Sequence, residues 1–304
     1  MKLLLFYLTG LLASLQICAQ PATLPGAVVI NEILFNPKSG GSDYIEIYNR
    51  TDSIINLKGW QIANRNAAGA VGSIKIFPSL AGVIMPGAYR VLTEEPVIIR
   101  QHYQVRDTAT FIPFSTLPSY PDARGAVVLL DSGNTIADEV SYLETWHFAL
   151  LNNNEGVALE RIGFNQPSQD AGNWHSAAAD AGYGTPGYRN SQQGSAGTPT
   201  GSITIEPKLF SPDNDGYNDY AIISYNFPEG GYVCNITVFN ILGIPIKLLV
   251  RSAVCGPTGF FKWDGSGEQG KSLPAGAYIV FTEVFDLHGK TKRFKQVLVL
   301  ARKH

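Results

Sequence analysis

Short stretches in which apolar and polar residues alternate recur along this chain, and they constrain its fold more than any other feature. Gly, Pro, Asn or Asp stands at most of their ends. Alternation at a period of two is typical of strands that bury one face, and short strands between turn residues are typical of antiparallel sandwiches. The sequence therefore predicts an all-β fold. The clearest stretches in the first part of the chain are residues 27–35 (AVVINEILF), 43–49 (DYIEIYN), 56–62 (NLKGWQI), 125–131 (GAVVLLD) and 155–162 (EGVALERI).

The alternation stops at residues 188–202 (YRNSQQGSAGTPTGS) and resumes after them. A segment rich in Gly, Ser, Thr and Gln buries little and is expected to act as a flexible tether. A chain of 304 residues has room for two domains. We therefore predict one β-sandwich over residues 20–190, a linker over 191–202 and a second sandwich over 203–304.

A single helix is expected in the first domain, at residues 93–104 (TEEPVIIRQHYQ). Thr93 can cap it, and Glu94 and Glu95 suit the positive end of the helix dipole. We expect it to cover one end of the sandwich.

Residues 1–19 have the layout of a secretory signal peptide. Lys2 precedes an apolar run over residues 3–12, and the small residue Ala19 precedes the expected cleavage point at Gln20. Acylation of Cys18 is the alternative. No other stretch is apolar for long enough to cross a membrane as a helix. The formal net charge of −2 argues against broad nucleic-acid binding, which usually needs a basic domain.

Cleavage after Ala19 leaves two cysteines, Cys234 and Cys255. In an exported protein this number is compatible with one disulfide. Two buried or unpaired thiols are the alternative.

The segment 211–222 (SPDNDGYNDYAI) carries three aspartates and two asparagines. Asp213, Asp215 and Asp219, with the amide oxygen of Asn218, offer the hard oxygen ligands that calcium prefers. The bidentate Glu of helical calcium loops is missing, because Ser224 stands at that position. The alternative is a turn in which these side chains bond the local backbone.

The sequence has no GxSxG, HExxH or CxxC pattern. His147 and His175 each follow a tryptophan, and together with Asp43 and Glu46 they could form a metal-dependent hydrolytic site. We consider a tryptophan in the core beside a half-exposed imidazole the better interpretation, and we predict that the protein is not an enzyme.

The first domain resembles the lamin-tail domain, an immunoglobulin-like sandwich also found in exported bacterial proteins. The resemblance lies in VVINEI (28–33), DYIEIYNRTD (43–52), INLKGWQI (55–62), VVLLDSGNTIADEVSY (127–142) and WHSAAADAGYGTPGYRN (174–190). It implies an interaction or attachment module. In bacteria such modules often occur beside secreted nucleases or phosphatases.

The second domain resembles the immunoglobulin-like module of flagellar hook-capping proteins and the C-terminal sorting domains of the type IX secretion system of Bacteroidetes. The similar segments are 209–219 (LFSPDNDGYND), 234–249, 261–280 (with WDG and PAGAY) and the basic end of the chain. Asp213 and Asn214 stand where the sorting domains carry Asn-Gly. The resemblance implies that a receptor recognises the basic end, whose positive residues are Lys290, Lys292, Arg293, Lys295, Arg302 and Lys303. An edge strand protected by lysines is the alternative.

The sequence thus predicts two immunoglobulin-like sandwiches in an exported, non-enzymatic interaction protein of the cell surface or medium. Its expected partners are the type IX secretion machinery and an extracellular ligand, and calcium is the one cofactor considered. A surface-bound metal-dependent nuclease or phosphoesterase and a calcium-stabilised adhesin are the alternatives.

Overall fold

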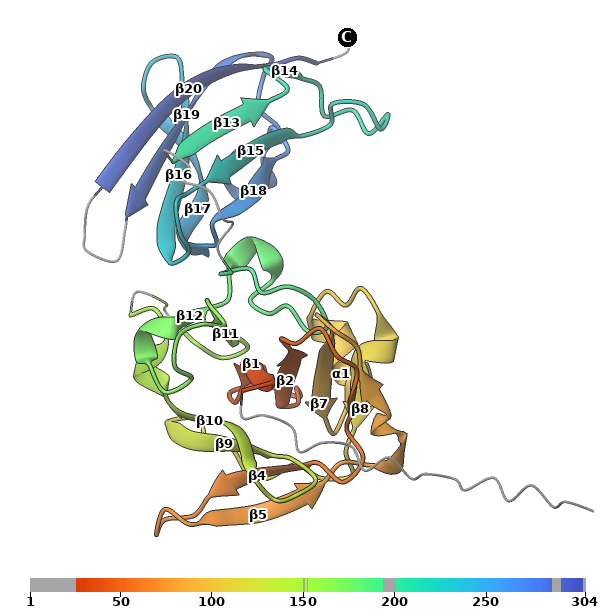
Figure 1. Ribbon diagram of the computed structural model, residues 1–304. Helices are drawn as coiled ribbons and strands as arrows, with labels where there is room; N and C mark the ends of the chain where they lie inside the picture. Colours follow the sequence, from red (N-terminus) through yellow and green to blue (C-terminus); the bar gives the residue numbers. More distant parts are fainter. Residues whose placement is uncertain (1–25, 150, 152, 194–200, 286–290, 303–304) are drawn as a thin grey trace, which may run out of the picture.

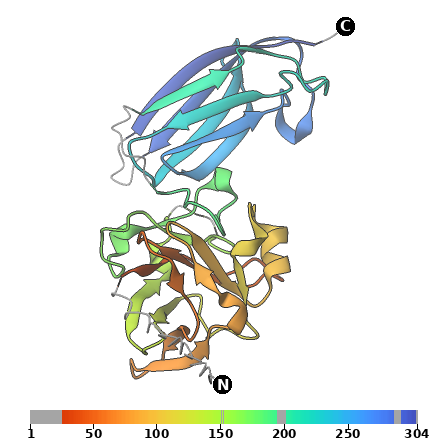
Figure 2. The ribbon, with the colours of Figure 1, turned by 45° about the vertical axis from the view of Figure 1, so that its right-hand side comes forward.

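The computed structural model describes residues 26–149, 151, 153–193, 201–285 and 291–302. Strands make up most of the regular structure in these ranges, which confirms the predicted all-β fold. They form two sandwiches that lie end to end, with the segment after β12 between them (Figures 1 and 2). No helix within these ranges is long and apolar enough to cross a membrane. The predicted signal peptide, residues 1–19, lies outside the described residues.

The first sandwich consists of a six-stranded sheet, a four-stranded sheet and one short strand pair. The six-stranded sheet, in the order β12-β11-β1-β2-β7-β8, contains β1 (Val28–Leu34), β2 (Tyr44–Asn49), β7 (Tyr89–Thr93), β8 (Phe111–Pro113), β11 (Leu159–Arg161) and β12 (Trp174–Ser176). The four-stranded sheet, in the order β10-β9-β4-β5, contains β4 (Gln61–Arg65), β5 (Val71–Ile76), β9 (Arg124–Leu130) and β10 (Ile136–Leu143). The pair is β3 (Ile55–Asn56) with β6 (Val83–Ile84).

Four of the five predicted stretches contain a strand, although the bounds differ. Residues 56–62 are not one strand, because they run from the end of β3 through a turn into the start of β4. At residues 155–162 only Leu159–Arg161 is a strand. Gly156 has a φ of +75°, which other residues rarely adopt, so the chain turns before it reaches the sheet.

Both faces of the six-stranded sheet are buried. On the inner face, Ile45 and Ile47 of β2 pack with Ile62 of β4 and Leu129 of β9 in the main core. The outer face carries a second apolar cluster, formed by Leu34, Tyr44, Val91, Ile99, Tyr103, Ala158 and Ala177. The sheet is therefore covered on its outer side as well, in part by a helix.

That helix, α1 (Pro96–His102), is shorter than predicted. Thr93 does not cap it; Thr93 ends β7, and its hydroxyl donates to the carbonyl oxygen of Asp43 at 2.7 Å. Glu95 stands at the N-cap position, and its side chain makes no capping bond. The expected cap was wrong because pairing of β7 with β2 fixes Thr93 in an extended conformation.

The second sandwich packs a three-stranded sheet on a five-stranded one. The first, β13-β15-β18, contains β13 (Ser202–Glu206), β15 (Ala221–Asn226) and β18 (Thr258–Trp263). The second, β14-β20-β19-β16-β17, contains β14 (Leu209–Phe210), β16 (Tyr232–Asn240), β17 (Pro245–Cys255), β19 (Gly276–Phe285) and β20 (Thr291–Leu300). Trp263, Ile223 and Val238 are among the buried residues that join the two sheets in one core.

Residues 188–193 do not behave as the predicted tether. Asn190 and Gln192 are buried, and Asn190 Nδ2 donates to the carbonyl oxygens of Asn31 and Arg161, each at 2.9 Å. This part of the segment therefore belongs to the first sandwich. The expectation failed because the amide side chains of Asn and Gln can donate hydrogen bonds to buried backbone carbonyls, just as water does to exposed ones. Residues 194–200 lie outside the described residues.

The two sandwiches are in direct contact. The carboxylate of Asp180 accepts hydrogen bonds from the Tyr225 hydroxyl at 2.7 Å and the Phe260 amide at 3.1 Å. Gln192 Oε1 accepts from the Gly231 amide at 2.8 Å. Gly256 lies so close to Ser191 that a side chain there would overlap the Ser191 carbonyl oxygen. These contacts fix the second sandwich on the segment that ends the first.

Candidate functional site

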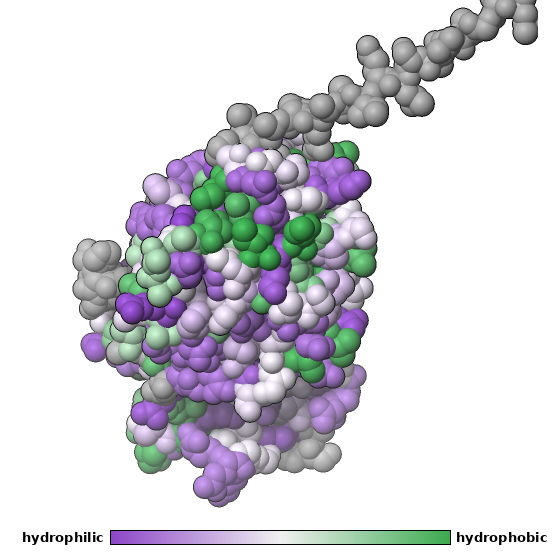
Figure 3. All heavy atoms as spheres, turned by 90° about the horizontal axis from the view of Figure 1, so that it is seen from below, coloured by the Kyte–Doolittle hydropathy of each residue, from purple (hydrophilic) through white to green (hydrophobic). Residues whose placement is uncertain are grey.

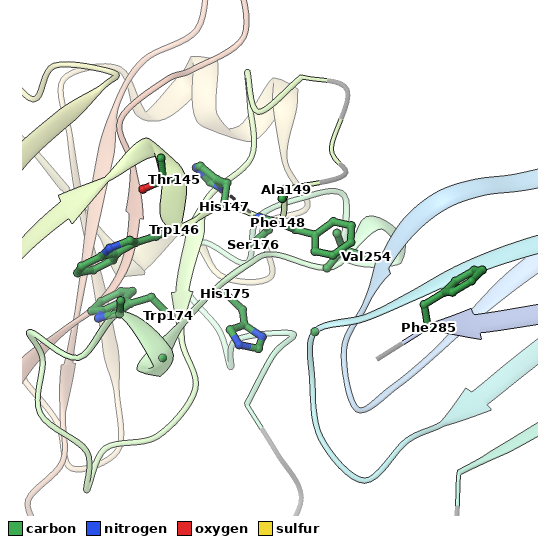
Figure 4. Close-up of a pocket in the computed structure, with 13 residues that line it drawn as sticks. Thr145, Trp146, His147, Phe148, Ala149, Trp174, His175, Ser176, Val254 and Phe285 are labelled. Carbon is green, nitrogen blue, oxygen red and sulfur yellow. Dashed lines mark hydrogen bonds between the residues drawn. The ribbon is translucent and has the colours of Figure 1, made fainter. Parts of the chain in front are cut away.

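A cavity of about 610 Å³ lies where the sandwiches meet, and residues of both line it. The first sandwich contributes Trp146, Phe148 and His175, and the second contributes Val254 and Phe285 (Figure 4). Most of these side chains are apolar or aromatic. A cavity of this size, at a domain interface and with mainly apolar walls, has the form of a small-molecule site.

Two short elements bring the aromatic side chains to the cavity. The 3-10 helix Glu144–Trp146 follows β10 and places Trp146 and His147 at its wall. The edge strand β12 provides Trp174 and His175. The Trp174 indole is anchored, because its N–H donates to the Ser168 carbonyl oxygen at 2.9 Å.

His147 presents one ring nitrogen without a partner. Its Nδ1 lies 3.0 Å from Ser176 Oγ, which accepts from the Phe148 amide at 3.0 Å. Ser176 Oγ has no other hydrogen-bond partner among the described residues, so its proton is satisfied when it donates to Nδ1. In that tautomer the ring proton is on Nε2. Nε2 is buried and has no hydrogen-bond partner among the described residues.

The polar atoms of the cavity are neutral at neutral pH. Burial lowers the pKa of His147 to about 4 and also lowers that of His175. His175 Nδ1 is a second buried nitrogen with no partner among the described residues. Among the described residues that line the cavity, none is Asp, Glu, Lys or Arg.

Next to this cavity, three buried glutamates cross the six-stranded sheet in one row. Glu32 of β1 is paired with Glu46 of β2 and with Glu160 of β11. Paired residues of neighbouring strands share a face, so the three side chains point to the same side. All three are fully buried.

The glutamates hold the chain segment that carries the second sandwich. Glu160 accepts from the Ser191 hydroxyl at 2.7 Å and the Gln192 amide at 2.8 Å. Glu46 accepts from the Gly187 amide at 2.6 Å. We call Gly187, Asn190, Ser191 and Gln192, with Thr185, the strap. The buried carboxylates thus accept hydrogen bonds from the strap that a neighbouring strand would otherwise accept.

The contacts of Thr185 and the raised pKa of Glu32 together indicate that one of these carboxyls carries a proton. The Thr185 hydroxyl lies 2.8 Å from Glu160 and 3.2 Å from Glu32, but it has a single proton to donate. If Thr185 donates to Glu160, then Glu32 satisfies the second contact by donating to Thr185. Burial first, and then the charge of Glu160, raises the pKa of Glu32 to about 8, which agrees with this assignment.

The sequence analysis missed this row. It considered Glu46 only as a hydrolytic ligand and did not single out Glu32 or Glu160. The available signal was a glutamate between apolar residues in the middle of three strands: INEIL, YIEIY and ALERI. A charged side chain at such a position is rarely buried unless it is paired or protonated.

The predicted loop residues Asp213, Asp215 and Asp219 do come together, with one oxygen of each within 4.8 Å of the others. The Asp219 carboxylate also accepts from the amides of Asn214 at 2.7 Å and Gly216 at 2.9 Å. Asn218 takes a φ of +53°, and its carbonyl oxygen accepts from the Ser211 amide at 2.9 Å. The loop thus has the bonds of the turn interpretation, and calcium binding stays a prediction.

Replacing Asp219 with alanine is expected to lower the stability of the second sandwich by about 1 to 2 kcal/mol, because two backbone amides lose their acceptor. Denaturation with and without calcium measures it, and Glu229→Ala is the control. A wild-type midpoint that calcium raises, and an Asp219→Ala midpoint that it leaves unchanged, would support metal binding. If calcium leaves the midpoint of the wild type unchanged, the loop acts only as a turn.

Cys234 and Cys255 lie on the neighbouring strands β16 and β17 as free, buried thiols. Burial and a hydrogen bond with Cys234 raise the pKa of Cys255. The thiols are therefore neighbours, and their pairing as a disulfide stays a prediction.

Four of the six basic residues at the chain end are described. Lys292, Arg293 and Lys295 are exposed on β20, and Arg293 pairs with Glu283 at 3.0 Å. Arg302 donates to the Leu273 carbonyl oxygen at 3.1 Å. Lys290 and Lys303 lie outside the described residues. The parallel partner β14 pairs only with Val299 and Leu300 of β20, so among the described residues no strand pairs with its basic part on that side. Gln296 of the same strand donates to the Ile203 carbonyl oxygen of β13.

The residues considered for a hydrolytic site are not brought together. His147 and His175 line the cavity between the sandwiches, whereas Asp43 lines a second cavity, of about 580 Å³, with Glu94 and Asp122. Burial and these two carboxylates raise the pKa of Asp43 to about 7. Glu46 lies in the buried row. The structure thus distributes the four side chains over three places.

The first sandwich also has an exposed apolar region. Figure 3 views the molecule from the side of β4 and β5 and shows apolar residues gathered on this face. Exposed apolar side chains of residues 54–85 are Ile54, Ile74, Ile76, Leu80, Val83 and Met85. Large exposed patches of this kind often mark contact surfaces.

Comparisons with solved structures give only distant similarities. PorZ, a surface component of the type IX secretion system of Porphyromonas gingivalis, is 15% identical, with a TM-score of 0.27. Dimeric latent PorU of the same organism is 11% identical, with a TM-score of 0.26. A Ca²⁺-stabilised adhesin with which an Antarctic bacterium binds ice is 10% identical, with a TM-score of 0.20. TM-scores this low support no argument about function.

The chain is much shorter than these proteins. The matches cover 90%, 91% and 93% of this chain, but only 39%, 20% and 50% of the other chains. A search of curated proteins found no match. A family model does match part of the first sandwich: residues 21–144 match the Lamin Tail Domain.

Proposed function

We propose that this protein is an exported, non-enzymatic binding protein of the cell surface or medium. The Lamin Tail Domain match supports an interaction module over residues 21–144. The observation that carries the proposal is the cavity between the sandwiches, which has apolar walls, neutral imidazoles and no charged lining residue among those described. Such a site is suited to binding rather than to acid–base catalysis, which needs a group that titrates near the working pH.

The second sandwich directs export through type IX secretion in this proposal. Lys292, Arg293 and Lys295 support it, because they form an exposed positive stretch on β20. A receptor with acidic residues would recognise this stretch electrostatically.

Neutralising this stretch tests the proposal. We expect Lys292→Gln, Arg293→Gln and Lys295→Gln together to leave the protein in the periplasm of a host with type IX secretion. The sandwich should stay folded, because the residues are exposed and the pair with Glu283 is a surface ion pair. Cell fractionation with intact-mass analysis is the measurement.

The matched control neutralises three exposed positive residues of the first sandwich, Lys58, Arg100 and Arg124. It should be exported like the wild type. Export of both triple variants to the same extent would contradict the role proposed for β20.

A further inference from the structure

The contact between the glutamate row (Glu32, Glu46 and Glu160) and the strap is built in a way that makes it depend on a proton. We propose that loss of a proton from the row releases the strap from the six-stranded sheet, and that the docking surface of the second sandwich leaves with it. This inference concerns how the two sandwiches are held together and does not depend on the proposed function.

The strap supplies hydrogen-bond donors to every member of the row. Among the described residues, the donors to the Glu160 side chain all belong to the strap. Movement of the strap away from the sheet therefore removes donors from all three glutamates at once, and water can replace them. The donors are the Thr185 amide to Glu32, the Gly187 amide to Glu46, and the Thr185 hydroxyl, Ser191 hydroxyl and Gln192 amide to Glu160.

No positive charge compensates the row. Its three glutamates are fully buried, and none of them forms an ion pair with a Lys, Arg or His of the described residues. A buried carboxylate without a partner of opposite charge is unfavourable, and a second carboxylate nearby makes ionisation harder still. The row therefore favours the strap-bound form most when it holds a proton. Released glutamates regain water and lose this proton more easily.

The pH range of the release follows from the shift of Glu32. Burial first, and then the charge of Glu160, raises the pKa of Glu32 from 4.5 to about 8 in the strap-bound form. Once hydrated, the carboxyl regains an ordinary pKa. The proton therefore holds the strap fully below pH 4.5, and this contribution is lost as the pH rises towards 8. Above pH 8 both forms are ionised, so the release levels off.

His175 and four tyrosines also face the row, and none of them titrates between pH 7 and 9. His175 of β12 is paired with Glu160, and burial lowers its pKa from 6.5. Burial raises the pKa of every one of the tyrosines above 10. Beside them lie Arg106 and Arg189, and an arginine stays charged throughout. The tyrosines are Tyr44, Tyr89, Tyr103 and Tyr188.

Release of the strap also removes the contacts that dock the second sandwich. Ser191 lies against Gly256, and Gln192 Oε1 accepts from the Gly231 amide. Both strap residues are bonded to Glu160. The cavity between the sandwiches is lined from both of them, so it opens when the strap leaves.

Trypsin cleavage after Arg189 in the purified full chain tests the proposal. Arg189 is exposed, but the next residue, Asn190, is buried and bonded to the backbone of Asn31 and Arg161. The bond between Arg189 and Asn190 thus becomes accessible to a protease only when the strap leaves the sheet. The initial rate of cleavage then follows the population of the released form.

We expect this rate to rise with pH in the wild type. Measured by mass spectrometry and divided by the rate at which trypsin cleaves a small peptide at the same pH, it should rise roughly 10-fold between pH 7 and 9. The rise should be steepest below pH 8, because the proton of Glu32 is lost there.

Glutamine variants of the row should lose this rise. Glu32→Gln keeps the hydrogen bonds and removes the group that titrates. Glu160→Gln is the second variant: its amide can donate to the Thr185 hydroxyl, and its oxygen still accepts from Ser191 and Gln192. Glu95→Gln, an exposed residue outside the row, is the control and should behave like the wild type.

Cleavage after Arg161 separates release of the strap from unfolding. Arg161 is buried in β11, so a protease reaches it only when the sandwich unfolds. In the wild type it should be cleaved at least about 10-fold more slowly than Arg189, because local opening needs less free energy than global unfolding. Equal rates at the two sites would overturn the proposal. A wild-type rate at Arg189 that does not rise with pH, or a rise that the glutamine variants retain, would overturn it too.

Discussion

Replacing Glu32 with glutamine is expected to make the protein more stable than the wild type above pH 7 and to flatten the dependence of its stability on pH. Glutamine resembles a protonated glutamate: its amide can donate to Thr185 Oγ1, while its oxygen accepts from the Tyr44 hydroxyl and the Thr185 amide. The buried hydrogen bonds are thus kept, and the group that titrates is removed.

The sign of this pH dependence follows from the direction of the pKa shift of Glu32. The pKa of Glu32 rises from its ordinary 4.5 to about 8, so the folded protein holds this proton more tightly than the unfolded chain. The contribution to stability is complete below pH 4.5 and is lost as the pH rises towards 8. For each proton that the folded protein holds and the unfolded chain releases, the free energy of unfolding changes by at most about 1.4 kcal/mol per pH unit. Glu46 and Glu160 have raised pKa values too, and they act in the same direction.

Urea denaturation between pH 6.5 and 9 measures the effect. At pH 8 we expect Glu32→Gln to exceed the wild type by about 2 to 4 kcal/mol, since no buried proton has to be taken up. His147 is neutral in the folded protein throughout this range, because burial lowers its pKa from 6.5 to about 4. In the unfolded chain it is half protonated at pH 6.5, and this contribution is the same in the wild type and in Glu32→Gln.

Glu95→Gln is the control, because Glu95 is exposed and makes no capping bond. The stability of Glu95→Gln should depend on pH in the same way as that of the wild type. A Glu32→Gln variant that is less stable at every pH would show that Glu32 is ionised in the folded protein and that the proton assignment is wrong.

Replacing Gly256 with valine is expected to separate the two sandwiches without unfolding either. The glycine is buried against the Ser191 carbonyl oxygen, and a side chain would overlap this backbone atom. Gly256 has no positive φ, so its own backbone can accept valine. Separation would break the bonds of Asp180 with Tyr225 and Phe260, and would expose residues of the cavity wall. Loss of these hydrogen bonds costs the interface roughly 2 to 4 kcal/mol.

NMR relaxation of backbone amides measures the separation. The wild type should tumble as one body, whereas Gly256→Val should show two shorter correlation times. Gly163→Ala is the control, since the nearest atom to a new Cβ there is 3.8 Å away. A single, unchanged correlation time in Gly256→Val would mean that the contact at Ser191 does not hold the sandwiches together.

The two predictions concern one continuous set of contacts. Glu160 binds Ser191 and Gln192, Gln192 binds Gly231, and Ser191 packs on Gly256. The buried glutamates therefore support the surface on which the second sandwich docks, and docking in turn forms the cavity.

Local pattern was enough to predict strands such as β1, β2 and β9, but it missed β5, β7 and β8. The alternation in residues 43–49 identifies β2 with nearly its observed bounds, because one buried face imposes a period of two wherever a strand lies in a sheet. The all-β fold follows from the same rule. The helix cap at Thr93 was wrong, since pairing with β2 outweighs the capping tendency of a threonine.

The aspartate loop was located from sequence because its residues are neighbours in the chain, and their oxygens do converge. The glutamate row could not be found in this way. Glu32, Glu46 and Glu160 become neighbours only through the register of three strands, and β11 joins β1 after more than a hundred intervening residues.

The sequence by itself determined several of the strands, where the alternation stops, and which residues could bind a metal in one loop. The tertiary structure alone decided that residues 188–193 are buried, that three carboxylates share one face, and that the sandwiches enclose a cavity. The physical reason is that periodicity and turn formation depend on adjacent residues. Burial, proton sharing and docking depend on distances between residues that are far apart in the chain, and these distances are set only when the sheets pack.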